Sequence, residues 1–233
     1  LAIKPATNDS EDFSLTVSVT EQEGDADPSN AVVQTLSVTV DPVSDEAEVE
    51  FKDSSGTEIT ANITGDHIIE DQSVPLFNGT LTSLTDANDE AAYLSGLEPF
   101  IRASVTDMVG DVAETITRIN ITIDDPDDLL STAYITHYSA LYDDTPDDIA
   151  TLAKITNLGG GIFSIKAEPV SGEDGVFTLP DGLVLVPPAD YNGPITLNVS
   201  ALSQDDTASS LESEATPLTF ELAPVAESAE VET

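Results

Sequence analysis

Apolar and polar residues alternate along short segments of the chain, and Gly, Pro, Asp and Asn cluster between these segments. A period of two predicts β-strands with one buried face, because successive side chains of a strand point to opposite sides. Short strands separated by turn residues at this spacing are typical of β-sandwiches. The pattern therefore predicts an all-β fold with strands at residues 13–20, 34–40, 47–51, 58–63, 101–106, 115–123, 161–167, 183–186, 195–201 and 218–222.

One short helix is predicted at residues 144–152, within the stretch DTPDDIATLA. Thr145 suits the N-cap position, and Pro146 suits the first helical position, where its missing N–H is not needed. Two acids follow in the first turn, where they oppose the positive end of the helix dipole. The rest of the chain has no comparable helical signal.

The chain contains an internal repeat. Residues 1–50 align without a gap on residues 183–232, and LAIKPATNDSEDFSLTVSVTEQEGD falls over LVLVPPADYNGPITLNVSALSQDDT. Roughly a quarter of these positions are identical, and the strand patterns coincide in phase. A fainter copy lies between them in IRASVTDMVGD and TRINITIDDPDD. All three copies have a strand, an acidic loop, a second strand and an acidic junction.

This repeated order of strands, acidic loops and acidic junctions predicts tandem Ig-like or cadherin-like β-sandwich domains in an extended array. Residues 1–44 are interpreted as the C-terminal strands of a preceding Ig-like domain, 45–126 and 127–226 as two sandwiches, and 227–233 as the start of the next linker. Alone, residues 1–44 would leave open sheet edges, so they are expected to pair with a neighbouring chain or with a missing front half. Whether the period of 182 residues is one composite domain or two stays open.

The charge balance is extreme. Forty-five acids and six bases give a formal net charge of −39, which weakens any compact state through self-repulsion unless the charge is neutralised. This excludes nucleic acid and anionic membranes as partners. Two agents could neutralise the charge: divalent cations bound at carboxylate clusters, or the high salt of a halophilic habitat.

The chain has no cysteine and no apolar run of eighteen residues. The first excludes disulfide stabilisation, and the second predicts no membrane-spanning segment. The opening residues LAIKPATNDS lack the features of a signal peptide. The sequence is therefore expected to begin within a longer protein.

Acid clusters beside strand ends predict calcium sites. Calcium takes six to eight oxygen ligands and tolerates irregular geometry, and in tandem sandwiches the loop between the last two strands lies near a junction. The candidate ligands are the loop and junction residues Glu21, Glu23, Asp25, Asp41, Asp45, Glu46, Asp107, Asp111, Asp124, Asp125, Asp127, Asp128, Asp205, Asp206 and Glu227, together with Asp86, Asn88 and Asp89 of the stretch DANDE.

Other site chemistries find no support in the sequence. DANDE lacks the glycine and glutamate that an EF-hand needs at its sixth and twelfth positions. His67 and His137 have no partner at zinc-ligand spacing. No GxSxG elbow and no glycine-rich loop before a helix occurs, so an enzyme is not expected.

Three stretches carry a family resemblance: EDQSVPLFNGTLTSLTDANDE, ITNLGGGIFSIKAEPVSGEDGVFTLPDGLVLVPPADYNGPITLNVSALSQDD and PVSDEAEVE. They resemble the tandem Ig-like or cadherin-like modules of giant bacterial surface adhesins, including the RTX type. The resemblance implies a secreted, cell-surface location and a non-catalytic extender role in cell adhesion and biofilms, with calcium stiffening the junctions. Implied partners are neighbouring repeat domains, and a host or cell-surface glycan or peptide bound through other domains.

Two alternative functions are carried forward. The first is a subunit of a surface layer or extracellular filament in a salt-adapted organism, where acids serve salt tolerance. The second is a calcium-dependent sugar- or peptide-binding module. Its pocket would be formed by an aromatic cluster beside acids, namely Tyr134, His137, Tyr138 and Tyr142 with Asp143, Asp144, Asp147 and Asp148.

Overall fold

The computed structural model describes residues 2–4, 6, 9–52, 73–76, 101–106, 113–142, 149–205 and 207–225. The predicted all-β fold is confirmed. Two one-turn helices interrupt the strands, α2 (Ser139–Tyr142) and α3 (Ile149–Leu152). The strands are β1 (Phe13–Val19), β2 (Val32–Val38), β3 (Glu48–Phe51), β4 (Val74–Pro75), β5 (Ile101–Ser104), β6 (Thr115–Asp124), β7 (Tyr134–His137), β8 (Ile155–Gly159), β9 (Ile162–Lys166), β10 (Glu168–Pro169), β11 (Val176–Thr178), β12 (Leu183–Val186), β13 (Gly193–Gln204), β14 (Leu211–Glu212) and β15 (Thr216–Leu222).

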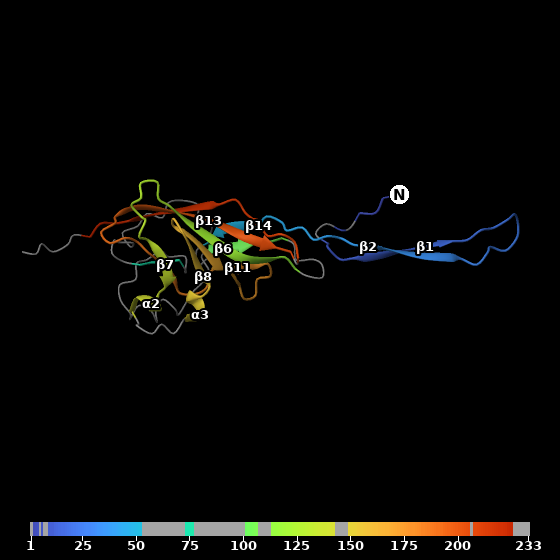
Figure 1. Cartoon of the computed structure of the whole chain (residues 1–233), viewed down its shortest axis with the longest axis horizontal. Coiled ribbons are helices and arrows are strands. Elements are labelled where there is room, and N and C mark those ends of the chain that lie inside the picture. The colour runs from blue at the N-terminus through green and yellow to red at the C-terminus, as the bar shows by residue number, and fades with distance from the viewer. Residues whose placement is uncertain are drawn as a thin grey trace, which may run out of the picture.

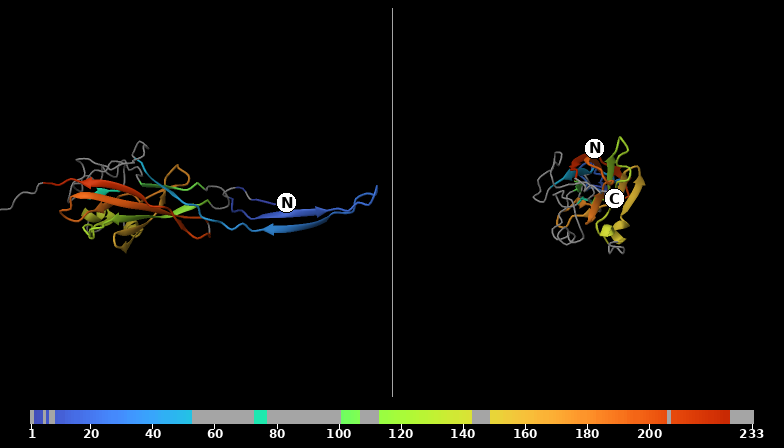
Figure 2. Two further views of the ribbon diagram at one scale, coloured as in Figure 1. Left: turned by 90° about the horizontal axis from the view of Figure 1, so that it is seen from above. Right: turned by 90° about the vertical axis from the view of Figure 1, so that its left-hand side faces the viewer.

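The chain has two parts of very different shape. β1 and β2 form an antiparallel hairpin that projects from one end of a sandwich built by the later strands (Figures 1 and 2). The chain enters the sandwich beside the hairpin, and β15 ends at the opposite end of the sandwich. Entry and exit therefore lie at opposite ends of the long axis.

Three antiparallel sheets build the sandwich. The largest has the order β14-β13-β6-β9-β8, with β15 pairing the first half of β13. A four-stranded sheet, β10-β11-β5-β3, and a three-stranded sheet, β4-β12-β7, complete the described strands. Their inward residues, including Ile101, Ile119, Ile195 and Phe220, form one continuous hydrophobic core.

Strand pairing crosses the predicted boundary at residue 126. β6 pairs with β9 and β13, and β5 pairs with β11, so strands from both sides of this residue share sheets. The described strands therefore do not divide into sandwiches at 45–126 and 127–226. The acidic, proline-containing run that suggested a linker is a turn between two elements of one sandwich, and composition does not distinguish these two cases.

The hairpin β1–β2 and the pair β13–β15 have the same register at the repeat offset of 182. Phe13 lies opposite Val38, and Leu15 lies opposite Leu36. In the sandwich the equivalent pairs are Ile195 with Phe220 and Leu197 with Leu218. The repeat found in the sequence is thus a repeated hairpin, with the same residues on the same face.

The predicted helix is present in part. α3 begins at Ile149, inside the predicted range 144–152, whereas residues 143–148 lie outside the described residues. The predicted strand at 58–63 also lies outside them. The sequence pattern did not predict β4, β7, β8, β10, β11 and β14, which are short or lack alternation.

Gly182 allows β12 to approach β7. Its backbone is left-handed (φ +75°), and an added Cβ would lie 2.2 Å from Nε2 of His137. Gly172 has a similar backbone (φ +83°) but open space around it. An alanine at either position would strain the left-handed backbone, but only an alanine at residue 182 would also clash with His137.

We expect Gly172→Ala to lower the free energy of unfolding by about 1 kcal/mol through backbone strain alone. Gly182→Ala is expected to lower it by about 2–4 kcal/mol, because overpacking against His137 adds to the same strain. Denaturant unfolding of both variants measures the difference. Equal losses would contradict the close approach of β12 to His137.

Candidate functional site

The candidate site lies where the hairpin meets the sandwich. Two hydrogen bonds from backbone N–H groups to carboxylates hold the ends of the connecting segment. Val40 N donates to Asp12 Oδ1 of the hairpin side over 2.9 Å, and Asp45 N donates to Glu114 Oε1 of the sandwich over 2.7 Å. Ser203 Oγ donates to the carbonyl oxygen of Asp45. The segment between these anchors is short and has no secondary structure, so the junction is brief.

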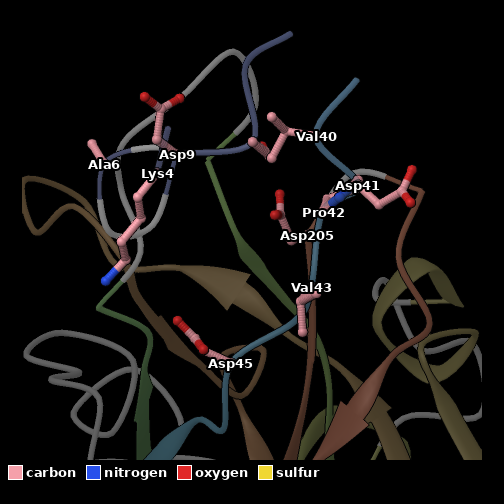
Figure 3. Close-up of a pocket in the computed structure, with 10 residues that line it drawn as sticks. Lys4, Ala6, Asp9, Val40, Asp41, Pro42, Val43, Asp45 and Asp205 are labelled. Carbon is pink, nitrogen blue, oxygen red and sulfur yellow. The ribbon is translucent and has the colours of Figure 1, made fainter. Parts of the chain in front are cut away.

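A pocket of about 290 Å³ opens at this junction (Figure 3). Three of its lining residues, Asp41, Asp45 and Asp205, are acids that the sequence predicted as calcium ligands, and Figure 3 shows their carboxylates apart, with that of Asp41 pointing away from the other two. Two of them come from the connecting segment, and Asp205 follows the last residue of β13. The remaining lining residues are Lys4, Ala6, Asp9, Ser10, Val40, Pro42 and Val43.

Two carboxylates at the junction are buried. Asp205 is 3% exposed and Glu114 only 1%. Asp205 N donates to Ser44 Oγ over 3.0 Å, so the turn after β13 is fastened to the connecting segment. Burying carboxylates is costly unless hydrogen bonds or cations compensate the charge. Glu114 was not among the predicted ligands, because Val112 and Ala113 separate it from Asp111, the last acid of the preceding loop.

The donor chemistry of the junction suits calcium, but the described donors are too few to complete a site. Within the described residues, no group of three or more His, Cys, Asp or Glu side chains is placed to hold a metal ion. Calcium needs six to eight oxygen ligands. Lys4 lines the same pocket and supplies one positive charge.

The predicted ligands of the first acidic loop lie elsewhere. Glu21, Glu23 and Asp25 are exposed in the loop between β1 and β2, at the far tip of the hairpin (Figure 1). They are therefore remote from the junction at Asp41 and Asp45. Glu23 is the repeat counterpart of Asp205, so the tip of the hairpin corresponds to the end of β13 that faces the junction.

Glu46 contacts the sandwich instead of the pocket. Its Oε1 accepts a hydrogen bond from Glu214 N over 2.8 Å. Seven further predicted ligands lie outside the described residues: Asp86, Asn88, Asp89, Asp107, Asp111, Asp206 and Glu227.

Asp124 is the last residue of β6, and the run from Asp125 to Asp128 leads into a turn of the sandwich. This run is not the domain junction that was predicted. Both carboxylate oxygens of Asp125 accept backbone hydrogen bonds, from Leu129 N at 2.7 Å and Leu130 N at 2.8 Å. Asp127 and Asp128 are exposed. Asp125 thus shapes the turn with its side chain.

Tyr191 lies beside the turn and lines a pocket of about 200 Å³ with Asp125. Its hydroxyl donates to the carbonyl oxygen of Pro194 over 2.7 Å. Burial, and then the negative charge of Asp125, raise the pKa of Tyr191 above its usual value. The phenol therefore stays neutral to higher pH than a solvated tyrosine.

Two residues of the aromatic cluster proposed as a ligand pocket, Tyr138 and His137, are part of the core. Tyr138 is fully buried and packs with Val184, and His137 is buried against Gly182. Tyr134 is exposed, and the acids at 143, 144, 147 and 148 lie outside the described residues. Side chains that fill the core cannot also line an open pocket, so this prediction is wrong for Tyr138 and His137.

Comparison with known proteins gives no relative: no family model, no curated protein and no solved structure matches the chain. Among the described helices, none has the length and apolar character needed to cross a membrane.

We expect Asp125→Ala to lower the free energy of unfolding by about 1–3 kcal/mol, because two hydrogen bonds to a charged group are lost. Asp127→Ala, at an exposed neighbour, should change it by less than about 0.5 kcal/mol. Denaturant unfolding measures both values. Asp125→Ala should also move the pKa of Tyr191 downward in an ultraviolet titration, since the charge is removed while burial stays. Equal stability losses would contradict the role of Asp125 in the turn.

Proposed function

We propose that the chain is a non-catalytic extender segment of a large secreted surface adhesin. The observation that carries this proposal is the repeated hairpin: β1–β2 has the register of β13–β15 at an offset of 182 residues. Together with entry and exit at opposite ends of the sandwich, this favours units joined end to end. The described residues contribute length and stiffness, and the location is the cell surface.

The junction supports a role for calcium in stiffening the array. Asp41 and Asp45 of the connecting segment and Asp205 of the following sandwich line one pocket, so both sides of the junction supply carboxylates there. A bound calcium ion would need further oxygen ligands besides these three side chains. Without a counter-ion, like charges across the junction repel and separate its two sides. Neighbouring repeat domains are the direct partners, and binding of a glycan or peptide belongs to other domains of the adhesin.

A surface-layer or filament subunit is the second candidate. The net charge of −39 supports it, because acids spread over a surface maintain solubility in molar salt. In that case cations act by general screening and need no specific ligands. The two functions therefore predict different responses to calcium and to sodium chloride.

We expect millimolar calcium to raise the melting temperature in low salt. An ion that binds only the native state adds about 2.7 kcal/mol to the free energy of unfolding when its free concentration is about 100 times its Kd. For a chain of this size, that corresponds to a rise of several degrees. Sodium chloride at the same ionic strength should not reproduce it, and chelator should reverse it. Calorimetry measures all three conditions.

The double variant Asp45→Asn, Asp205→Asn should lose most of this response. Asp190→Asn is the matched control, because Asp190 is exposed and lies before β13, at the opposite end of that strand from Asp205. A melting temperature that does not change with calcium but rises in molar sodium chloride would favour the surface-layer or filament subunit. An equal loss of response in Asp190→Asn would remove the junction from consideration as the site.

A further inference from the structure

The β1–β2 hairpin has one apolar face and one hydroxyl face. Ser14, Thr16, Thr35 and Ser37 share the second face. The first carries Phe13, Leu15, Val17, Val19, Val32, Leu36 and Val38, with Gln34 as its one polar residue, while Val33 lies on the hydroxyl face. Several of these side chains face solvent, with Val17 54%, Leu36 59% and Val32 70% exposed. An isolated two-stranded hairpin is at best marginally stable in water, so this face needs a cover.

The counterpart of this face in the sandwich shows what covers it. Ile195, Leu197 and Val199 are fully buried, and Leu218 is 3% exposed. They share one core cluster with Val49 and Phe51 of β3 and with Ile101 and Ala103 of β5. Along its other edge, β13 pairs with β6, whereas among the described residues β1 pairs with β2 alone.

The two hairpins also match in volume at their cross-strand pairs. Phe13 opposite Val38 corresponds to Ile195 opposite Phe220, so one aromatic and one β-branched residue change strands at the same position. Such an exchange conserves the volume offered to a facing sheet. Ile3 borders a hollow of about 540 Å³ on the hairpin, and its counterpart Leu185 is fully buried. The face is thus shaped for the same kind of cover.

We propose that the apolar face of β1–β2 closes a second sandwich, whose other half is supplied by the polypeptide that precedes the hairpin. This half is equivalent to residues 45–182, and its strand equivalent to β6 pairs with the free edge of β1. Antiparallel pairing then places three inward apolar residues, the equivalents of Ile119, Ile121 and Ile123, opposite Val19, Val17 and Leu15.

The charge of the chain favours a cover in the same polypeptide over a second copy. Two separate chains, each with a net charge of −39, repel one another. A covalent connection supplies the cover at millimolar effective concentration and overcomes that repulsion. The proposed second sandwich rests on the end-to-end arrangement of the proposed function, but it does not require bound calcium. The experiment that tests it is therefore carried out in the presence of a chelator.

The test compares the chain as it exists with an extended chain in which a copy of residues 45–182 is fused directly before Leu1. The fusion places Leu1 where Leu183 stands in the sandwich. Hydrogen exchange of the amides of β1 and β2 is the measurement. We expect rapid exchange in the unextended chain at all concentrations, and exchange slower by about 100-fold or more in the extended chain.

Substitutions in the extended chain separate the two faces of the hairpin. Leu36→Asp should abolish the added protection, whereas Thr35→Asp, on the hydroxyl face of the same strand, should retain it. The double variant Phe13→Ile, Val38→Phe recreates the pair that residues 45–182 accommodate in the sandwich. It should be protected even if the direct fusion packs poorly.

Three results would overturn the proposal. Protection in the unextended chain that rises with protein concentration would assign the cover to a second copy. Protection there that is independent of concentration would mean that the hairpin needs no cover. Rapid exchange in both the direct fusion and the Phe13→Ile, Val38→Phe fusion would show that this kind of half-sandwich does not fit. None of these results bears on the response of the melting temperature to calcium.

Discussion

The twelve-residue strand β13 is the element on which the described structure depends. Its alternation buries Ile195, Leu197, Val199 and Ala201 completely, while its edges pair with β6 on one side and with β14 and β15 on the other. A shift of one residue would turn all four side chains to solvent, so burial fixes the register. Burying each of the three larger side chains contributes roughly 1.5–3 kcal/mol. Sheet order and core follow from this register.

The same strand links packing to the chemistry of the junction. β13 ends immediately before Asp205, so this buried carboxylate lies at the end of the sandwich where β13 ends. That end faces the connecting segment with Asp41 and Asp45, while β15 leads the chain to the opposite end. In the hairpin, the equivalent strand β1 ends before Glu21 and Glu23. In the proposed array, repetition of this unit would place acids at each junction.

Much of the fold was predictable because alternation reports burial on one face. The predicted bounds of β12 and β1 agree with the structure to within one residue. The boundary at residue 126 was not predictable, since Asp125 makes a turn with the same composition as a linker. Glu114 and the packing of Tyr138 depend on contacts between distant segments, which one-dimensional patterns do not contain.

The central claim, an end-to-end arrangement held at a short junction, is tested most directly by a distance measurement across that junction. The chain has no cysteine, so spin labels can be placed uniquely at Ala26→Cys in the tip of the hairpin and at Glu221→Cys in β15. Pulsed electron resonance should give a single long distance, narrow in calcium and broader in chelator. A short distance, with the hairpin folded back on the sandwich, would contradict the account, as would a broad distribution that calcium does not change.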